Sequence, residues 1–209
     1  MTTPQPSTIV LASGNRKKIA ELQQLLNALD VNVVSQTSLG VSDVPETGSS
    51  FVENALIKAR NACRQTGLPA IADDSGLEVF ALQGQPGIYS ARYSGENACD
   101  DSNNRLLLEN MQGITNRQAR FVCILTYMRH AEDSTPVICQ GFWNGRILDR
   151  PVGENGFGYD PLFFIDDQGC TSAQLDPVIK NRISHRGQAM QQLKAHLQQH
   201  HQPRNGLES

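Results

Sequence analysis

The sequence predicts an α/β fold built on a mixed β-sheet. Strand-like and helix-like segments alternate through the N-terminal part of the chain, and two long strand-like segments follow each other as a hairpin further on. The 209 residues, of which 39% are hydrophobic, are enough to bury a sizeable core. No abrupt change in composition divides the chain. We therefore expect a single domain over residues 1–209, with loose termini at 1–6 and 202–209.

The N-terminal elements follow from hydrophobic periodicity. Residues 8–12 are an apolar run rich in β-branched side chains, which indicates a buried strand. Leucine and isoleucine then recur at helical spacing, which predicts an amphipathic helix over 17–29. A second strand is predicted at 31–34 and a second helix at 51–63, where phenylalanine and alanines share one face.

The remaining elements are read from the same periodicities. They are a buried strand at 69–72 with a β continuation at 77–82, a short helix at 103–111, an antiparallel pair at 118–129 and 135–143, a glycine-rich loop at 152–161, a strand at 162–165 and a last helix at 187–200. Residues 73–76 are interpreted as a loop that follows a strand, and 180–187 as a loop that enters a helix. Polar residues in such loops are good candidates for function.

Composition excludes several classes of protein. The 18 basic and 21 acidic residues give a net charge of −3, which fits neither a basic nucleic-acid coat nor an acidic disordered chain. The sequence has no apolar run of the length a membrane span requires, and the N-terminus lacks the pattern of a signal peptide. The 5 cysteines form no C-x-x-C pair, which favours reduced thiols. We expect a cytoplasmic protein with no direct nucleic-acid or membrane partner.

A candidate phosphate-binding segment follows the first predicted strand. It is Ser13-Gly14-Asn15-Arg16-Lys17-Lys18, where a glycine turns the chain and a helix begins with positive side chains. Backbone amides at a helix N-terminus together with lysine suit a phosphate group. The alternative is an ordinary helix cap followed by a solvated basic face.

A candidate metal site lies at Asp73-Asp74-Ser75-Gly76, directly after a predicted buried strand. Carboxylate oxygens suit Mg²⁺, which usually shares its ligands with substrate phosphates. The alternative is a turn in which aspartate and glycine serve backbone geometry only. Glu46 and Glu53 are further carboxylates that could complete a metal shell with Asp74, although capping of a helix also explains Glu53.

Two later segments offer binding groups. In Gly156-Phe157-Gly158-Tyr159-Asp160-Pro161 the glycines allow close approach of a ligand, and the aromatic rings offer faces for stacking on a base. The alternative is a turn whose aromatic residues fill the core. In the segment from Lys180 to Gly187, Lys180, His185 and Arg186 supply donors for phosphate or for the carbonyl edge of a purine, or form a solvated basic loop.

Taken together and in this order, these motifs resemble the non-canonical purine nucleoside triphosphate pyrophosphatases, also called inosine triphosphatases or XTP/dITP diphosphatases. The matching stretches are Ser13–Lys18 with Glu21, Thr47–Ala59, Ala72–Val79, Pro86–Gly95, Phe157–Pro161 and Ile183–Ala189. The resemblance implies a two-lobed α/β fold with a central mixed sheet flanked by helices and an active-site cleft between the lobes. It also implies a homodimer.

The implied reaction is Mg²⁺-dependent hydrolysis of ITP, dITP or XTP to the monophosphate and pyrophosphate. The resemblance makes Asp74 the general base and a metal-linked carboxylate, and Ser75 a substrate contact. It assigns substrate binding to Ser13, Gly14, Asn15, Arg16, Lys17, Lys18, Phe157, Gly158, Tyr159, Asp160, Lys180, His185 and Arg186. Relatives often carry two acids before Thr-Gly, whereas this chain has Pro45-Glu46, so Glu46 is the less secure metal ligand. The alternatives are a pyrophosphatase for another modified nucleotide and a nucleotide-binding module without hydrolysis.

Overall fold

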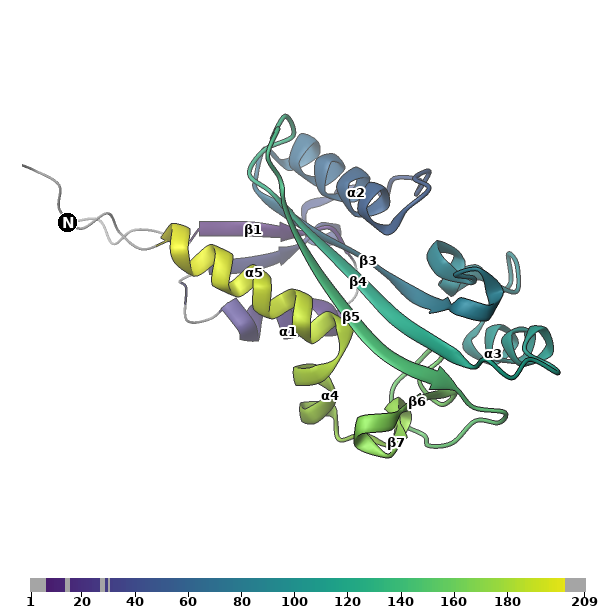
Figure 1. Ribbon diagram of the computed structural model, residues 1–209. Helices are drawn as coiled ribbons and strands as arrows, with labels where there is room; N and C mark the ends of the chain where they lie inside the picture. The colour runs from purple at the N-terminus through teal and green to yellow at the C-terminus, as the bar shows by residue number, and fades with distance from the viewer. Residues whose placement is uncertain (1–6, 14–15, 27–28, 30, 202–209) are drawn as a thin grey trace, which may run out of the picture. The chain divides into compact units, whose positions relative to one another are not determined.

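The computed structural model describes residues 7–13, 16–26, 29 and 31–201. Within these residues, seven strands form one sheet in the order β2-β1-β3-β4-β5-β6-β7 (Figure 1). The strands are β1 (Ser7–Leu11), β2 (Val31–Ser35), β3 (Ala70–Val79), β4 (Gln118–Met128), β5 (Val137–Ile147), β6 (Phe163–Ile165) and β7 (Cys170–Thr171). The α-helices are α1 (Arg16–Leu26), α2 (Phe51–Thr66), α3 (Asp100–Asn110), α4 (Pro177–Ile183) and α5 (His185–His201).

The sheet is mixed. Strand β1 pairs in parallel with β2 and β3, whereas β6 pairs antiparallel with β5 and β7. The expected α/β fold with a mixed sheet and flanking helices is therefore confirmed.

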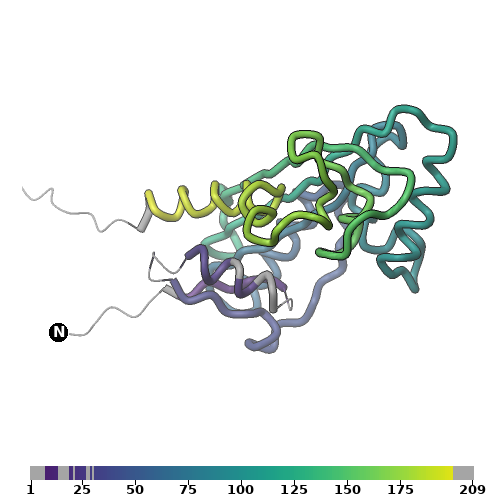
Figure 2. Tube along the Cα trace, turned by 90° about the horizontal axis from the view of Figure 1, so that it is seen from below, coloured from purple at the N-terminus to yellow at the C-terminus, as the bar shows by residue number. Residues whose placement is uncertain are grey.

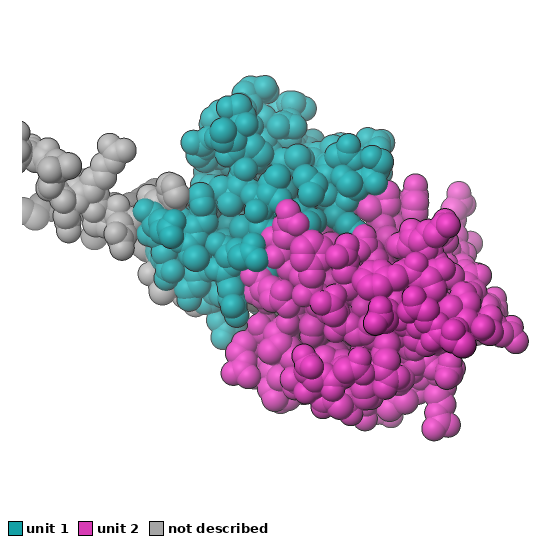
Figure 3. Space-filling model, in the orientation of Figure 1, with its two compact units in different colours: residues 1–73, 124–139, 189–209 teal, residues 74–123, 140–188 magenta. Residues whose placement is uncertain are grey.

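The chain forms two compact units, coloured separately in Figure 3. Unit 1 contains residues 1–73, 124–139 and 189–209, and unit 2 contains residues 74–123 and 140–188. Strands β3, β4 and β5 each contribute residues to both units. The two units agree with the expected two lobes, and the cleft expected between the lobes stays a prediction.

The core of unit 1 joins α2 to β1 and β3. Ala59 and Ala62 of α2 are fully buried and pack in one cluster with Val10 and Ala72 of the two strands. Because these helix residues are small, the helix backbone approaches the strands closely. Helix α1 contacts β2 and lies on the other side of these strands from α2 (Figure 1).

Helix α2 begins and ends at residues that satisfy its terminal backbone groups. The Ser50 hydroxyl accepts a hydrogen bond from the Glu53 backbone N–H at 3.3 Å, which is a serine N-cap. At the other end Gly67 adopts φ +69°, and its N–H donates to the Cys63 carbonyl at 2.8 Å. These caps place Glu53 in the first turn of the helix.

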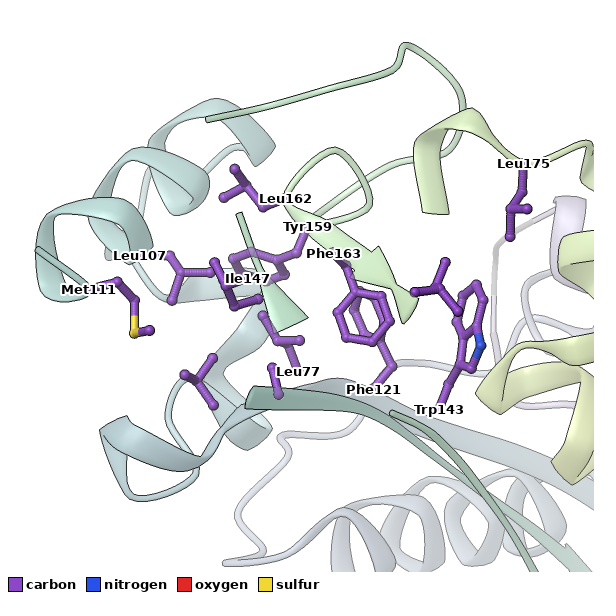
Figure 4. Packing of buried hydrophobic residues seen from close by; sticks show 13 residues of the cluster. Leu77, Leu107, Met111, Phe121, Trp143, Ile147, Tyr159, Leu162, Phe163 and Leu175 are labelled. Carbon is purple, nitrogen blue, oxygen red and sulfur yellow. The ribbon is translucent and has the colours of Figure 1, made fainter. Parts of the chain in front are cut away.

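The core of unit 2 is built around aromatic side chains (Figure 4). The Phe163 ring lies 4.5 Å from the Phe121 ring and 5.6 Å from the Trp143 ring, measured between centroids. Leu107 of α3 and Met111, which directly follows that helix, join this cluster. Helix α3 also contacts the 3₁₀ helix η4 (Gly87–Arg92); the backbone of both is part of the trace in Figure 2. Aromatic packing thereby fixes α3 to the strands of unit 2.

Three predictions of local structure are wrong. The loop expected at 73–76 is part of strand β3, which runs unbroken from Ala70 to Val79. Leu77 and Val79 are fully buried, so burial of apolar side chains holds the strand extended beyond the polar residues. Of the β continuation expected at 77–82, residues 80–82 form a 3₁₀ turn instead.

The loop expected at 180–187 is also wrong, because Lys180 lies inside helix α4 and His185 begins helix α5. The signal for α4 is local: Asp176 caps the helix by accepting from the Val178 N–H at 2.8 Å, and Pro177 is the first helical residue. The two-residue strand β7 was not predicted. The termini expected to be loose, 1–6 and 202–209, lie outside the described residues.

No helix in the described part of the chain combines the length and apolarity needed to cross a membrane.

The connection between β4 and β5 is held by a buried carboxylate. Asp133, which is 3% exposed, accepts hydrogen bonds from the Arg129 guanidinium at 2.5 and 2.8 Å and from the backbone N–H groups of Arg129 and Thr135 at 3.0 Å. The hydrogen bonds from Arg129 hold the pKa of this carboxyl well below its usual range.

Replacement of this carboxylate tests its contribution to stability. Asp133→Asn is expected to lower the free energy of unfolding at pH 7 by about 1–3 kcal/mol, because buried donors lose their charged acceptor. Since the pKa of Asp133 is lower in the folded than in the unfolded chain, its contribution is full above pH ~4 and declines as the pH falls further. The difference between wild type and variant, measured by urea unfolding, should therefore shrink toward pH 3.

Asp149→Asn is the matched control, because Asp149 also pairs with an arginine, Arg117 at 3.2 Å, but has a side chain 93% exposed. Asp149→Asn is expected to lower the free energy of unfolding by less than about 1 kcal/mol. An equal decrease in the free energy of unfolding for the two variants would show that burial of Asp133 has no consequence for stability.

Candidate functional site

A polar cavity of about 360 Å³ lies in unit 1. Its lining residues come from β3, α2 and the segments that follow β1 and β2, and are Ala12, Ser13, Gln36, Asp43, Val44, Glu46, Lys58 and Asp73. The cavity thus combines carboxylates, a hydroxyl and an ammonium group. This is the combination needed to hold an anionic ligand together with a cation.

Strand register brings Ser13 and Asp73 together. Strands β1 and β3 are parallel, with Leu11 opposite Ile71, and each site residue lies two positions further along its own strand direction. The Ala12 N–H donates to the Ile71 carbonyl at 2.8 Å and continues this pairing. Ser13 follows the carboxyl end of β1, and ligands of parallel α/β sheets bind at such ends.

Two charged or polar pairs organise the cavity. The Lys58 ammonium contacts Glu46 Oε1 at 2.7 Å, and the side chains are 18% and 29% exposed, respectively. Gln36 Nε2 donates to Asp43 Oδ1 at 2.6 Å. The ammonium of Lys58 is therefore partly neutralised within the cavity, and a second carboxylate is held by a neutral amide.

The two glutamates proposed for a metal shell differ in position. Glu46 lines the cavity. Glu53 is used at the start of α2, where its Oε2 accepts from the Ser49 N–H and the Ser49 hydroxyl, both at 2.7 Å. These hydrogen bonds from Ser49, and a further one from Ser50, lower the pKa of Glu53. The contacts of Glu53 are those of a capping residue.

The donor set suits a cation that is shared with a ligand. Asp43, Glu46 and Asp73 all line the cavity, yet among the residues that the structure describes no group of three acidic, histidine or cysteine side chains forms a ready-made metal site. Mg²⁺ commonly takes one or two protein carboxylates and completes its shell with water and phosphate oxygens. The residues present fit that kind of binding.

Asp74 is placed differently from its neighbour. The acid that β3 contributes to the described lining of this cavity is Asp73, whereas Asp74 begins unit 2. Successive side chains of a strand point to opposite faces, so the two carboxylates are directed apart. Asp74 is 9% exposed, and its Oδ1 accepts from the Ser75 N–H at 3.2 Å.

A second group of predicted residues meets in unit 2, around the loop 156–160. The buried Asp160 carboxylate accepts from the Phe157 N–H at 2.9 Å, from the Ser172 hydroxyl at 2.7 Å and from the Lys180 ammonium at 2.5 Å. Gly156 has φ +86°, and a Cβ there would collide with the Asp160 carboxylate. Glycine is thus required for this close approach.

The two aromatic residues of this loop have different environments. Phe157 is 62% exposed, and the Lys180 ammonium lies 5.3 Å from its ring centroid. Tyr159 is 4% exposed, and its O–H donates to the Ser90 carbonyl at 2.8 Å. Burial raises the pKa of Tyr159. Tyr159 fills the core, and Phe157 is the ring presented to solvent.

His185 and Arg186 form the first turn of α5. The His185 ring stacks on Phe121 with centroids 4.8 Å apart and planes inclined by 15°, and it lies 6.3 Å from Trp143. The N–H of Gly187 donates to the Ser184 hydroxyl at 3.2 Å, so serine caps the helix. A Cβ at Gly187 would collide with the Asn181 carbonyl, so glycine allows α4 and α5 to join tightly.

The first phosphate-binding candidate is described only in part. Ser13 lines the cavity of unit 1, and the backbones of Arg16, Lys17 and Lys18 form the first turn of α1. Gly14 and Asn15 lie outside the described residues.

Sequence reasoning missed three polar residues of the cavity, Gln36, Asp43 and Lys58. Of these three, Lys58 has a local signal, because it lies four residues after Asn54 and so on the same face of α2. The Asn54 Oδ1 accepts from the Gly48 N–H at 2.9 Å, which places that face beside the segment that carries Glu46.

Comparisons with known proteins agree with the sequence motifs. Residues 9–196 match the model of the Ham1 family. A protein of Vibrio vulnificus strain YJ016 named dITP/XTP pyrophosphatase is 55% identical over 193 residues, covering 91% of this chain and 96% of the relative. A protein of Escherichia coli O157:H7 with the same name is 54% identical over 187 residues, 88% of this chain and 95% of the relative.

Solved structures give the same result. The structure of a HAM1 protein from Coxiella burnetii superposes with a TM-score of 0.91 at 49% identity, over 92% of this chain and 99% of that one. The Staphylococcus aureus Ham1 protein gives 0.87 at 42% identity, over 93% and 100% of the two chains. The match extends through both units, and the chain belongs to the Ham1 family.

Proposed function

We propose that this protein hydrolyses the non-canonical purine nucleoside triphosphates dITP, XTP and ITP to the monophosphate and pyrophosphate, and so removes them from the nucleotide pool. The observation that carries the proposal is the 55% identity, over nearly the full length of both chains, to a protein named dITP/XTP pyrophosphatase. The charged cavity of unit 1 supports it, because a triphosphate needs both cationic groups and a metal ion to balance its charge.

The phosphates are bound in the polar cavity, where Ser13 and Lys58 supply a hydroxyl and an ammonium group. The family resemblance adds Gly14, Asn15, Arg16, Lys17 and Lys18 to the phosphate contacts. This local positive charge is needed because the chain as a whole has a net charge of −3.

Asp74 and Glu46 are the carboxylates that would hold Mg²⁺. When bound, the ion neutralises phosphate charge and favours ionisation of water. Asp74 takes the proton from the attacking water as general base, and Ser75 contacts the substrate. The water oxygen bonds to the α-phosphorus, the bond from that phosphorus to the bridging oxygen breaks, and pyrophosphate leaves.

The purine is bound by residues of the loop 156–160 and of the segment 180–186. Phe157 stacks on the base, and the other residues of this loop, Gly158, Tyr159 and Asp160, help to bind the base. Lys180, His185 and Arg186 supply donors to the 6-oxo group and the phosphates. A base with an amino group at that position leaves such donors unpaired, and buried unpaired donors discriminate strongly between ligands.

The family resemblance adds a homodimer to the proposal. Composition and sequence pattern add a single domain over 1–209 and a location in the cytoplasm without a nucleic-acid or membrane partner.

The products of the reaction test the proposed chemistry. With dITP and Mg²⁺, the protein is expected to yield dIMP and pyrophosphate in equal amounts, measured by anion-exchange chromatography, while dATP is turned over far more slowly. Orthophosphate as the only phosphate product would contradict cleavage at the α-phosphorus. Binding of dITP without any turnover would favour a nucleotide-binding module instead.

Asp74→Asn tests the general base. We expect kcat/KM for dITP to fall roughly 10²- to 10⁴-fold, because the amide cannot accept the proton from water. Asp167→Asn is the control, since Asp167 is an exposed acid in the 3₁₀ turn 166–168 and its substitution removes the same charge. Comparable activity in the two variants would remove Asp74 from this role.

Removal of divalent cations tests the metal requirement. Activity toward dITP is expected to disappear in excess EDTA and to return on addition of Mg²⁺, because the carboxylates otherwise repel the phosphates. Thermal denaturation in EDTA serves as a control that the fold persists. Undiminished turnover in EDTA would refute metal dependence.

A further inference from the structure

The loop 156–160 is held by the first turns of helix α3. The Gly158 N–H donates to Asp100 Oδ2 at 2.6 Å, and the Gly158 carbonyl accepts from Asn104 Nδ2 at 2.9 Å. Asp100 and Asn104 are four residues apart in α3, so they project from the same face of the helix. One helix face therefore fixes both backbone polar groups of Gly158.

Helix α3 is itself firmly anchored. Leu107 and Met111 are fully buried in the core cluster of unit 2 (Figure 4). Asn103 is 4% exposed; its Oδ1 accepts from the Ser94 N–H at 2.8 Å and its Nδ2 donates to the Ser90 carbonyl at 3.3 Å. The side chains that contact Gly158 thus extend from a rigid support.

The side-chain amide of Asn104 has a buried oxygen without a hydrogen-bond partner among the described residues, which is unfavourable for folding. The residue is 9% exposed. An unsatisfied buried acceptor destabilises the fold, and an apolar residue at this position would avoid that penalty. The remaining polar contact of this amide is its donation to Gly158.

These contacts fix the backbone on both sides of Phe157. On one side the Phe157 N–H donates to the Asp160 carboxylate, which pairs with Lys180; on the other, Gly158 is held by α3. The Phe157 ring itself remains 62% exposed. A fixed backbone that presents an exposed ring is the arrangement that lowers the entropic cost of stacking on a ligand.

We propose that Asp100 and Asn104 are positioning residues that orient Phe157 for contact with the purine base, an inference that rests on the proposed function. Neither residue touches the substrate. They act through Gly158, and their loss affects binding of the base rather than the hydrolytic step.

A double-mutant cycle tests this positioning role. Asp100→Ala is expected to raise KM for dITP about tenfold, the effect of one charge-assisted hydrogen bond, with kcat within about twofold of wild type. Asp100→Asn, which keeps an acceptor, should restore most of the loss. In a Phe157→Ala background, Asp100→Ala should have no further effect, because both changes remove the same contact. If the increases in KM of the two single variants were additive in the double variant, the proposal would be overturned.

Asp101→Ala is the matched control. Asp101 lies next to Asp100 in the same exposed first turn, so its loss removes the same charge from the same helix end. Its KM is expected to equal that of wild type. Asn104→Leu provides a second variant, expected to raise KM about threefold to tenfold while the Tm stays the same or rises. Equal KM values for Asp100→Ala and Asp101→Ala would overturn the proposal.

Hydrogen exchange separates failure of this inference from failure of the proposed function. The Gly158 amide should exchange about tenfold faster in Asp100→Ala than in Asp101→Ala, whether or not the protein turns over dITP. If the Gly158 amide exchanges faster in Asp100→Ala but the wild-type protein does not turn over dITP, the proposed function is refuted, while the contact between α3 and the loop is confirmed. Equal exchange rates would refute the contact with α3 itself.

Discussion

The candidate site depends on strand β3 remaining extended through two adjacent aspartates. Asp73 and Asp74 are 6% and 9% exposed, and burial of ionised carboxylates is unfavourable unless they are paired or bind a cation. Apolar residues on both sides of this pair are fully buried, and their burial keeps the strand straight. The pleat then directs the two carboxylates to opposite faces, which a turn would not do.

The parallel pairing of β1 with β3 adds the second constraint. It brings the end of β1 beside Asp73, where Ser13 and the ion pair of Glu46 and Lys58 complete the cavity. In unit 2 the Asp160 carboxylate has a similar role. It accepts a hydrogen bond from the Phe157 N–H and pairs with Lys180 of α4, and so joins the loop to that helix. In both units a carboxylate pairs with a lysine that lies in a helix further along the chain, 12 residues away in unit 1 and 20 in unit 2.

The sequence predicted what depends on local periodicity. The strands β1, β2 and β4 and the helices α2 and α3 lie close to their expected residues, because each has an apolar face or run of clear period. It failed at Asp73–Gly76 and at Lys180, where polar residues looked like loop but tertiary burial or a short Asp-Pro cap decided the structure. Gln36 and Asp43 could not be found, since the cavity that they line arises from contacts between separate segments of the chain.

The ion pair in the cavity of unit 1 has a consequence for which anions can bind there. Because Lys58 already has Glu46 as its counter-ion at 2.7 Å, an incoming anion must compete with a tethered carboxylate. An anion with one charge gains little from this exchange, whereas an anion with several charges can contact more than one donor of the cavity at once. The ion pair therefore favours polyanions over singly charged anions at this cavity.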